Sequence, residues 1–388
     1  MKTYLLSGWL CCCGTGLCPA QTNLVPVGHI DDGGEADAVA VSGQYAYLAN
    51  YTDGLRIYNI SNPTNPVPVG HTNSTAFFYD WSIAVAGNHV YTGTRIAGLS
   101  VYDISNPGAP AAVTVVATNT LANDIAVSGQ YAYVANDGQG LRVYSLTNPA
   151  LPVLVGFASN GNAAIGVAVS CDHVYLANWK AGLQIYNVAN PTNPIALGQA
   201  YTTGFARDIA VSGSYAYIAD DNAGLRIFNV SNPTNPVPTG FIDNGGTGYG
   251  VAIAGNYAYL ANGSDGLRIY DVSDPSNPMN VAHVNSGGLA RGLVVRGPYA
   301  YLANGGDGLR IYWLGTPPAP VLTALSTTTN AMVLSWPAPS AAFTLQQSTN
   351  PAAGIWETVS GPLSVVAGRN QLVLPRTGPA RFYRLQSE

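Results

Sequence analysis

The chain has 388 residues and a net charge of -5; only 9% of its residues are charged, while 47% are hydrophobic. This composition excludes a disordered chain, and the lack of any Lys/Arg cluster argues against nucleic acid as a partner, because phosphate binding needs concentrated basic side chains. The 44 glycines, 26 prolines and 24 tyrosines are typical of short strands joined by tight turns.

Residues 1–20 have the pattern of a secretory signal peptide. Lys2 precedes a mostly apolar stretch, and Cys18-Pro19-Ala20 offers small residues for cleavage. We therefore expect a secreted protein, extracellular or at the cell surface, with the periplasm and a lipid anchor left open. Four of the five cysteines lie in this segment, so the mature chain keeps only Cys171 and forms no internal disulfide. No other stretch is long and apolar enough to predict a membrane span.

A phrase close to "AVSG" recurs along the rest of the chain at a spacing of 44 and then 42 residues. Each copy predicts four strands; in the first copy these are 37–43, 45–50, 54–60 and the run "PVPVGH". Turn formers separate the strands, and no run has helical spacing. The last residue of the phrase stands, in the seven copies, at Gly43, Gly87, Gly129, Cys171, Gly213, Gly255 and Gly297.

Seven copies of four short antiparallel strands predict an all-β chain with a seven-bladed β-propeller over residues 21–315. The seventh copy stops after its third strand at 308–314, where "GTPPAP" breaks the pattern. The missing fourth strand has a spare copy at 24–30, ahead of the first blade. We therefore expect residues 24–30 to close blade seven.

The phrase "YAYLANYTDGLRIYNISNPTNPVPVG" resembles the LVIVD repeat family of bacterial, mostly secreted β-propellers. The marks are aromatic-Ala-Tyr-aliphatic-Ala, then Gly-Leu-Arg-aliphatic-aromatic, then Ser-Asn/Asp-Pro-x-x-Pro, and they cover residues 25 to 320. The resemblance implies a propeller and export, but it implies no reaction.

Residues 321–388 share none of this pattern and follow a Pro-rich linker at 316–320. Alternating runs such as "MVLSW" and "QLVLP" resemble a small fibronectin type III-like sandwich, with Trp336 and Tyr383 at core positions. The resemblance implies a spacer or a surface-attachment module, with glycan binding as an alternative.

One position of the first strand varies from copy to copy while its neighbours stay monotonous. It stands six residues before the end of the anchor phrase, where the seven inner strands meet, and Asp124 and Asp208 follow it in two copies. The loops between the second and third strands should open onto the same face, and Trp, Tyr and Arg are typical of recognition surfaces. The alternative is that these loop residues vary only because nothing constrains them. The predicted ligand-binding residues are Asp37, Trp81, Asn123, Arg207, Asp208, Tyr249, Arg291, Tyr51, Arg95 and Trp179.

Other polar residues are interpreted as structural. The arginine of "GLRIY" recurs in most blades and is expected to snorkel or to bond loop carbonyls. His29, His71 and His283 share one outer-strand position and are expected to pack on the surface. The acidic loop 31–37 is expected to be solvated, although close carboxylates leave Ca²⁺ open. We predict no metal and no cofactor.

Three functions remain in competition. The preferred one is a non-enzymatic extracellular module, expected to be a monomer, that binds a protein or a glycan. The second is a polysaccharide lyase or hydrolase that uses Arg207, Arg291 and Tyr249 with Asp37 or Asp208, although no histidine stands near this mouth. The third is a structural protein of the cell envelope.

Overall fold

The structure is a computed structural model. It describes residues 24–31, 33–51, 53–73, 80–94, 98–118, 120–159, 161–243, 245–315, 323–326, 331–337, 343–349, 356–359, 364–366, 369–375 and 381–387. The predicted signal peptide at 1–20 and the predicted linker at 316–320 lie outside these ranges. None of the described residues forms a helix that would be long and apolar enough to cross a membrane.

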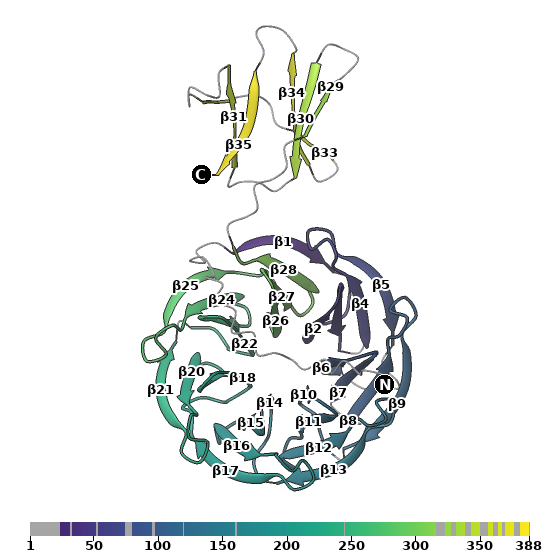
Figure 1. Cartoon of the computed structure of the whole chain (residues 1–388), viewed down its shortest axis with the longest axis vertical. Helices are drawn as coiled ribbons and strands as arrows, with labels where there is room; N and C mark the ends of the chain where they lie inside the picture. Colours follow the sequence, from purple (N-terminus) through teal and green to yellow (C-terminus); the bar gives the residue numbers. More distant parts are fainter. Residues whose placement is uncertain are drawn as a thin grey trace, which may run out of the picture.

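Seven four-stranded antiparallel sheets form the blades of a β-propeller, and the first strand of each blade lies nearest the centre of the ring (Figure 1). The inner strands are β2 (Ala38–Ser42), β6 (Asp80–Ala86), β10 (Asp124–Ser128), β14 (Gly166–Ser170), β18 (Asp208–Ser212), β22 (Gly250–Ala254) and β26 (Gly292–Arg296). The second strands are β3 (Tyr45–Ala49), β7 (His89–Thr94), β11 (Tyr131–Ala135), β15 (His173–Ala177), β19 (Tyr215–Ala219), β23 (Tyr257–Ala261) and β27 (Tyr299–Ala303).

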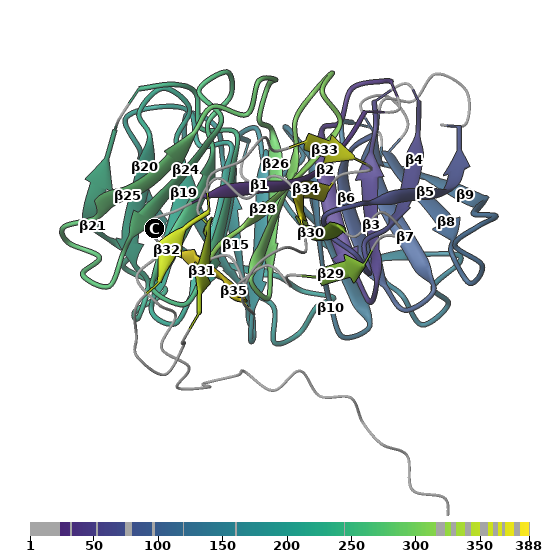
Figure 2. The same ribbon diagram turned by 90° about the horizontal axis from the view of Figure 1, so that it is seen from above.

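The two remaining strands of each blade lie toward the rim (Figure 1), and Figure 2 shows the ring edge-on. The third strands are β4 (Leu55–Asn59), β8 (Gly98–Asp103), β12 (Leu141–Ser145), β16 (Leu183–Asn187), β20 (Leu225–Asn229), β24 (Leu267–Asp271) and β28 (Leu309–Trp313). The outer strands are β5 (Val67–Thr72), β9 (Ala111–Ala117), β13 (Val153–Ala158), β17 (Ile195–Ala200), β21 (Val237–Ile242), β25 (Met279–Val284) and β1 (Val25–Ile30).

The first strand of the chain completes the last blade. β1 pairs antiparallel with β28, in a register that sets Val25 opposite Trp313 and Ile30 opposite Leu309, and the sheet order is β1-β28-β27-β26. The prediction that residues 24–30 supply the fourth strand of blade seven is therefore confirmed. Strands from the two ends of the propeller sequence share one sheet, so neither end is left as an unpaired blade.

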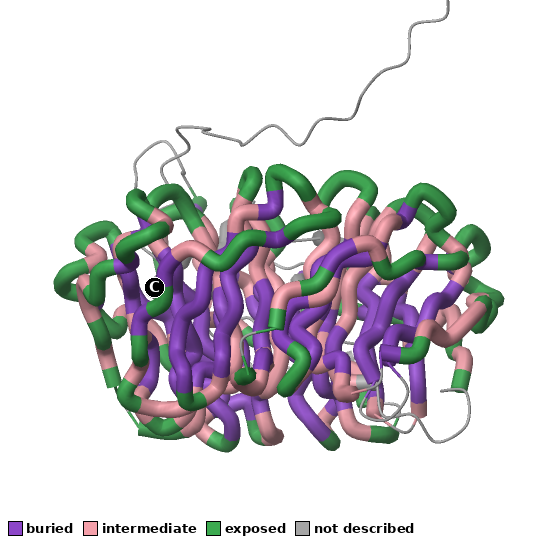
Figure 3. The backbone as a smooth tube through the Cα atoms, turned by 90° about the horizontal axis from the view of Figure 1, so that it is seen from below, coloured by how far each residue is buried: buried purple, intermediate pink, exposed green. Residues whose placement is uncertain are grey.

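The core lies between blades rather than within one. Tyr175 and Ile185 of blade four pack with Ile209, Ile218 and Phe228 of blade five in one buried cluster. Figure 3 shows the buried strands as a band between exposed loops. A single repeat cannot bury its apolar face alone, so seven copies stabilise one another around the ring.

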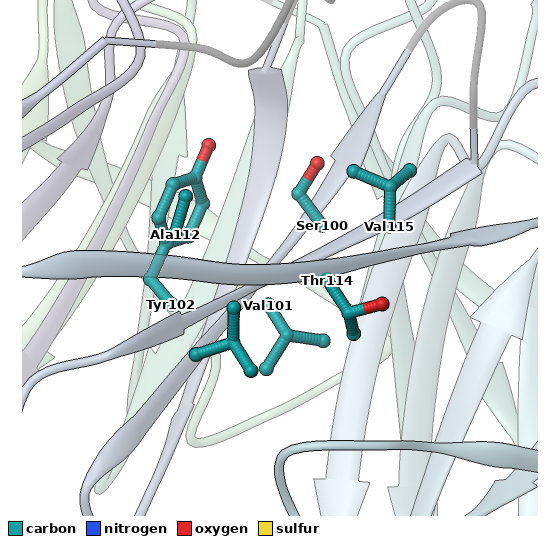
Figure 4. Close-up of a pocket in the computed structure, with 7 residues that line it drawn as sticks. Ser100, Val101, Tyr102, Ala112, Thr114 and Val115 are labelled. Atoms are coloured by element: carbon teal, nitrogen blue, oxygen red, sulfur yellow. The ribbon is translucent and has the colours of Figure 1, made fainter.

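Glycines of the outer strands let the next blade approach closely. A Cβ placed on Gly70 would meet the carbonyl oxygen of Pro107 in the Pro-rich turn of blade two. Blade two has Thr114 at the corresponding register position, opposite Val101. A pocket of about 230 Å³ lies there between β8 and β9 (Figure 4), the two strands of blade two that lie toward the rim in Figure 1.

The C-terminal region forms two small sheets. Their strands are β29 (Thr323–Ser326), β30 (Ala331–Pro337), β31 (Phe343–Ser348), β32 (Glu357–Thr358), β33 (Ser364–Val366), β34 (Arg369–Pro375) and β35 (Phe382–Ser387). The sheet orders are β29-β30-β34-β33 and β32-β31-β35, and Leu334 and Leu372 of the first pack with Leu345 of the second. Tyr383 packs partly buried against this cluster, whereas the side chain of Trp336 lies outside the described part. The likeness to fibronectin type III stays a prediction.

Candidate functional site

A pocket of about 560 Å³ opens where the seven inner strands begin, at one end of the central channel. Every blade contributes to it, because residues at or just before the start of each inner strand line the pocket. We call it the mouth pocket. Its lining residues are Asp37, Ala38, Val39, Trp81, Ser82, Ile83, Leu121, Asn123, Asp124, Asp137, Ile165, Trp179, Arg207, Asp208, Tyr249, Gly250, Arg291, Gly292 and Leu293.

The mouth pocket brings together most of the residues that the sequence selected. Tyr51 is not among the lining residues, and Arg95 lies outside the described residues. Asp137 lines the pocket and was missed, although it stands at the same loop position as Trp179 in a neighbouring blade. Eight of the ten predicted residues line the pocket: Asp37, Trp81, Asn123, Trp179, Arg207, Asp208, Tyr249 and Arg291.

Backbone hydrogen bonds between blades fix the loop residues beside the inner strands. The N–H of Ala206 donates to the carbonyl oxygen of Trp179 at 3.0 Å, and the N–H of Trp179 donates to that of Ala206 at 3.1 Å. Asp137 and Ala164 form the same reciprocal pair one blade earlier. A loop residue of one blade is therefore held next to the residue that precedes the inner strand of the following blade.

These loop residues have a left-handed backbone. The φ angles are 50° at Tyr51, 40° at Asp137, 48° at Trp179 and 52° at Asp221. This conformation costs a residue with a Cβ on the order of 1 kcal/mol. Blades six and seven use glycine at the equivalent position (Gly263 and Gly305). The fold therefore accepts glycine here, and the four residues with a Cβ at this position carry a cost.

Arg207 lies between two aromatic rings. Its guanidinium carbon is 5.0 Å from the centroid of the Trp179 ring and 4.7 Å from that of Tyr249. Its Nη2 donates to Asp221 Oδ2 at 2.9 Å. Phe205 stacks on Trp179 with ring centroids 4.7 Å apart. Residues of three blades thus form one preorganised stack, in which the charge of Arg207 is matched by Asp221.

Arg291 makes a second cluster at the mouth, in the blade that follows Tyr249. Its two terminal nitrogens donate to Asp37 and to Glu35, so it joins blade seven to blade one. The Asp37 side chain is only 4% exposed, so this pair is largely removed from water. The acidic loop 31–37 therefore directs two of its carboxylates to an arginine. Of its other two carboxylates, that of Asp31 accepts from the N–H of Gly33 at 2.9 Å, and Asp32 lies outside the described residues.

Asp124 and Asp208 hold backbone groups of two blades at once. Asp124 accepts from the N–H of Ile125 and from that of Val167 in the next blade, both at 2.8 Å. Burial in the protein-walled channel raises the pKa of Asp124 to about 6. The same cause, with repulsion from Asp124, raises the pKa of Asp208 to about 7. Both carboxyl groups therefore change charge near neutral pH.

The histidines and repeated arginines away from the mouth form structural clusters. In blade one the Nε2 of His71 lies 2.8 Å from the carbonyl oxygen of Asp53, whose carboxylate accepts from Arg56. His283 and His29 repeat this arrangement in blades six and seven. Arg268 and Arg310 likewise donate to the carboxylates of Asp265 and Asp307, which are side-chain oxygens of the loop and not the loop carbonyls that were expected. No three His, Cys, Asp or Glu side chains among the described residues are placed to hold a metal ion.

The family profile described as an LVIVD repeat matches the chain seven times, at residues 33–74, 79–118, 121–158, 161–203, 203–243, 245–286 and 287–322. No curated protein matches the chain significantly.

Three solved structures are similar to the chain. The β-propeller domain of Cps50 (Swd1) from Myceliophteria thermophila is 12% identical over 76% of this chain and all of its own length, with a TM-score of 0.61. A chain of a mitotic checkpoint complex is 11% identical over 77% of this chain and 98% of its own, with a TM-score of 0.63. The computationally designed Ika8 protein is 8% identical over 75% and 99%, with a TM-score of 0.55. At these identities the likeness shows the fold alone.

Proposed function

The chain belongs to the LVIVD repeat family of β-propellers, and we propose that it is a non-enzymatic recognition module that binds an extracellular glycan in the mouth pocket. The observation that carries the proposal is the convergence on one pocket of eight side chains that vary in an otherwise monotonous repeat. A position with only a structural role would be uniform, as its neighbours are. Export is part of the proposal and rests on the signal-like sequence of residues 1–20.

The shape of the site favours a glycan over a protein surface. A pocket of about 560 Å³ is within the usual range for a small ligand, and it is concave with polar groups on all sides. A stable protein partner needs a flatter contact of about 800 Å² on each side. One or two sugar units match the mouth pocket better.

A glycan array and a panel of secreted proteins, probed in parallel with residues 21–388, test the proposal. We expect glycan binding, and we expect Trp81→Ala and Arg207→Ala to weaken it about tenfold or more without unfolding. Tyr201→Ala is the control, because Tyr201 is 73% exposed and lies outside the pocket. Binding only to proteins, or equal affinity in all three variants, would refute the assignment.

One observation favours a second function. Asp124 and Asp208 titrate near neutral pH, as general acids and bases of polysaccharide-active enzymes do. Against it, Arg207 and Arg291 are both engaged by carboxylates. Product analysis after incubation with each bound glycan separates the two: intact glycan supports recognition, and new chain ends support catalysis.

A further inference from the structure

The two channel aspartates show how the inner strands bind an oxygen ligand. Asp208 accepts from the N–H of Ile209 at 2.7 Å and from that of Val251 in the next blade at 2.8 Å, as Asp124 does with Ile125 and Val167. Two adjacent inner strands therefore present N–H groups that converge on one pair of oxygen atoms. In blades three to six this N–H group donates to one of the two aspartates. The four donors are Ile125, Val167, Ile209 and Val251.

The other three blades offer the same donor to the pocket. Val39, Ile83 and Leu293 occupy the register position that Ile125 occupies in blade three. Their N–H groups therefore point toward the channel, and within the described ranges no side chain accepts from them. All three residues line the mouth pocket. Because they belong to blades two, seven and one, which are neighbours, they form a continuous arc of donors that we call the donor arc.

The opposite side of the pocket carries acceptors. Asp124 and Asp208 belong to blades three and five, and Asp137 belongs to blade three. No cation is paired with these three carboxyl groups in the described part of the chain. The pocket is thus bipolar, with backbone donors on one side and carboxylates on the other.

The charges around the pocket argue against an anionic ligand. The charge of Arg207 is matched by Asp221, and that of Arg291 is outweighed by Asp37 and Glu35. The carboxyl groups of the acceptor side add negative charge, and a low-dielectric channel strengthens their repulsion of an anion. A neutral ligand with both donors and acceptors avoids this repulsion.

We infer that the mouth pocket takes a neutral sugar, whose acceptor oxygens bind the donor arc and whose hydroxyl groups donate to Asp124 and Asp208. This inference rests on the proposed glycan-binding function and specifies its ligand class and its orientation. It adds the backbone N–H groups of Val39, Ile83 and Leu293 to the expected ligand contacts. The pattern of side chains in the sequence does not reveal these groups.

The arrangement has a pH signature. A hydroxyl group donates more strongly to an ionised carboxylate than to a protonated one. Since burial raises the pKa of Asp124 to about 6 and of Asp208 to about 7, affinity for a neutral sugar should rise between pH 5 and pH 8. An anionic sugar would show the opposite trend. The other charged groups at the mouth are Glu35, Asp37, Asp137, Asp221, Arg207 and Arg291.

Amide NMR of the isotope-labelled mature protein tests the inference, with N,N′-diacetylchitobiose as the neutral probe and glucuronate as the anionic probe. We expect the neutral probe to shift the amide signals of Val39, Ile83 and Leu293, with affinity that rises severalfold from pH 5 to pH 8. Ala38→Asp should weaken that binding about tenfold or more, because its carboxylate would occupy the N–H groups of Val39 and Ile83 as Asp124 occupies its own pair. Ser128→Asp, at the other end of an inner strand, adds the same charge and should bind as the parent does.

The outcomes separate the inference from the proposed function. Glycan binding that Ala38→Asp leaves unchanged, or that weakens as pH rises, overturns the inference while the glycan-binding function stands. Tighter binding of glucuronate than of the neutral probe also overturns it. If neither probe shifts the amide signals of the three donor-arc residues, the inference is overturned, whether or not Ala38→Asp folds. A glycan array without any hit overturns the proposed function as well.

Discussion

The guanidinium carbon of Arg207 lies 5.0 Å from the centroid of the Trp179 ring, although the two residues belong to different blades. The pairing of Trp179 with Ala206 through two backbone hydrogen bonds sets this distance. Trp179 holds a φ of 48° at a position where two other blades use glycine. Its side chain is therefore kept at a conformational cost, which points to a role in what the pocket binds.

Trp179→Gly should keep the fold and weaken glycan binding. Relief of the left-handed strain, about 1 kcal/mol, offsets the loss of ring stacking and of the cation–π contact, about 1 kcal/mol each. We expect a free energy of unfolding within about 1–2 kcal/mol of the parent and a clear fall in glycan affinity. Tyr51→Gly is the matched control, since Tyr51 has a φ of 50° but does not line the pocket. Equal losses of affinity in both variants would contradict the assignment.

Cys171→Gly should stabilise the propeller. Cys171 has a φ of 50° in an exposed turn where the other six blades have glycine at 55–59° with open space around it. Removing the Cβ relieves about 1–2 kcal/mol of strain, and the greater freedom of glycine in the unfolded chain opposes part of it. The expected gain is about 0.5–1 kcal/mol by chemical denaturation. Cys171→Ser removes the thiol but keeps the strain, so a gain of the same size there would count against this account.

Gly28→Ala should weaken the closure of the ring. Its Cβ would meet the carbonyl oxygen of Pro63, a backbone atom that cannot turn aside, at the junction of blades seven and one. We expect a loss of about 1–3 kcal/mol, in one cooperative transition because the blades share their cores. In Gly306→Ala the new Cβ has nothing within 4 Å, so this control should melt like the parent. A Gly28→Ala protein with unchanged melting would show that β1 contributes little to closure.

The channel aspartates should make stability depend on pH. The pKa of Asp208 is raised to about 7, so the folded protein holds a proton that the unfolded chain has already lost. The stabilisation from protonation is complete below about pH 4 and is lost as pH rises through about 7. Relative to Asp208→Ala, the parent should therefore lose on the order of 2 kcal/mol between pH 5 and pH 8.5.

Urea denaturation at several pH values measures this difference. Asp274→Ala is the control, because its turn partner Ser276 lowers the pKa of the Asp274 carboxyl, which stays ionised over the whole range. If the parent and Asp208→Ala have parallel profiles, the carboxyl is not shifted toward neutrality.

The repeat itself settled the architecture. A period of 42 residues with four strands admits a propeller, and the lone strand ahead of the first blade could only complete the last one, as the pairing of β1 with β28 confirms. Comparison of the repeat copies also located the mouth pocket. A residue such as Trp81 or Arg207 is recognised as unusual only because the other copies share the residues around it. Such signals lie within one strand or one turn, so the order of the residues is sufficient to reveal them.

Contacts between blades could not be predicted in this way. Asp208 reaches the N–H of Val251 43 residues away, and Arg291 pairs with Asp37 across the closure. These contacts decide which charges are matched and which backbone donors stay open, and they depend on how far each blade turns against the next. The sequence alone determined the number of blades and the place of the pocket, whereas the packing of neighbouring blades decided the charge, the protonation and the polarity of the pocket.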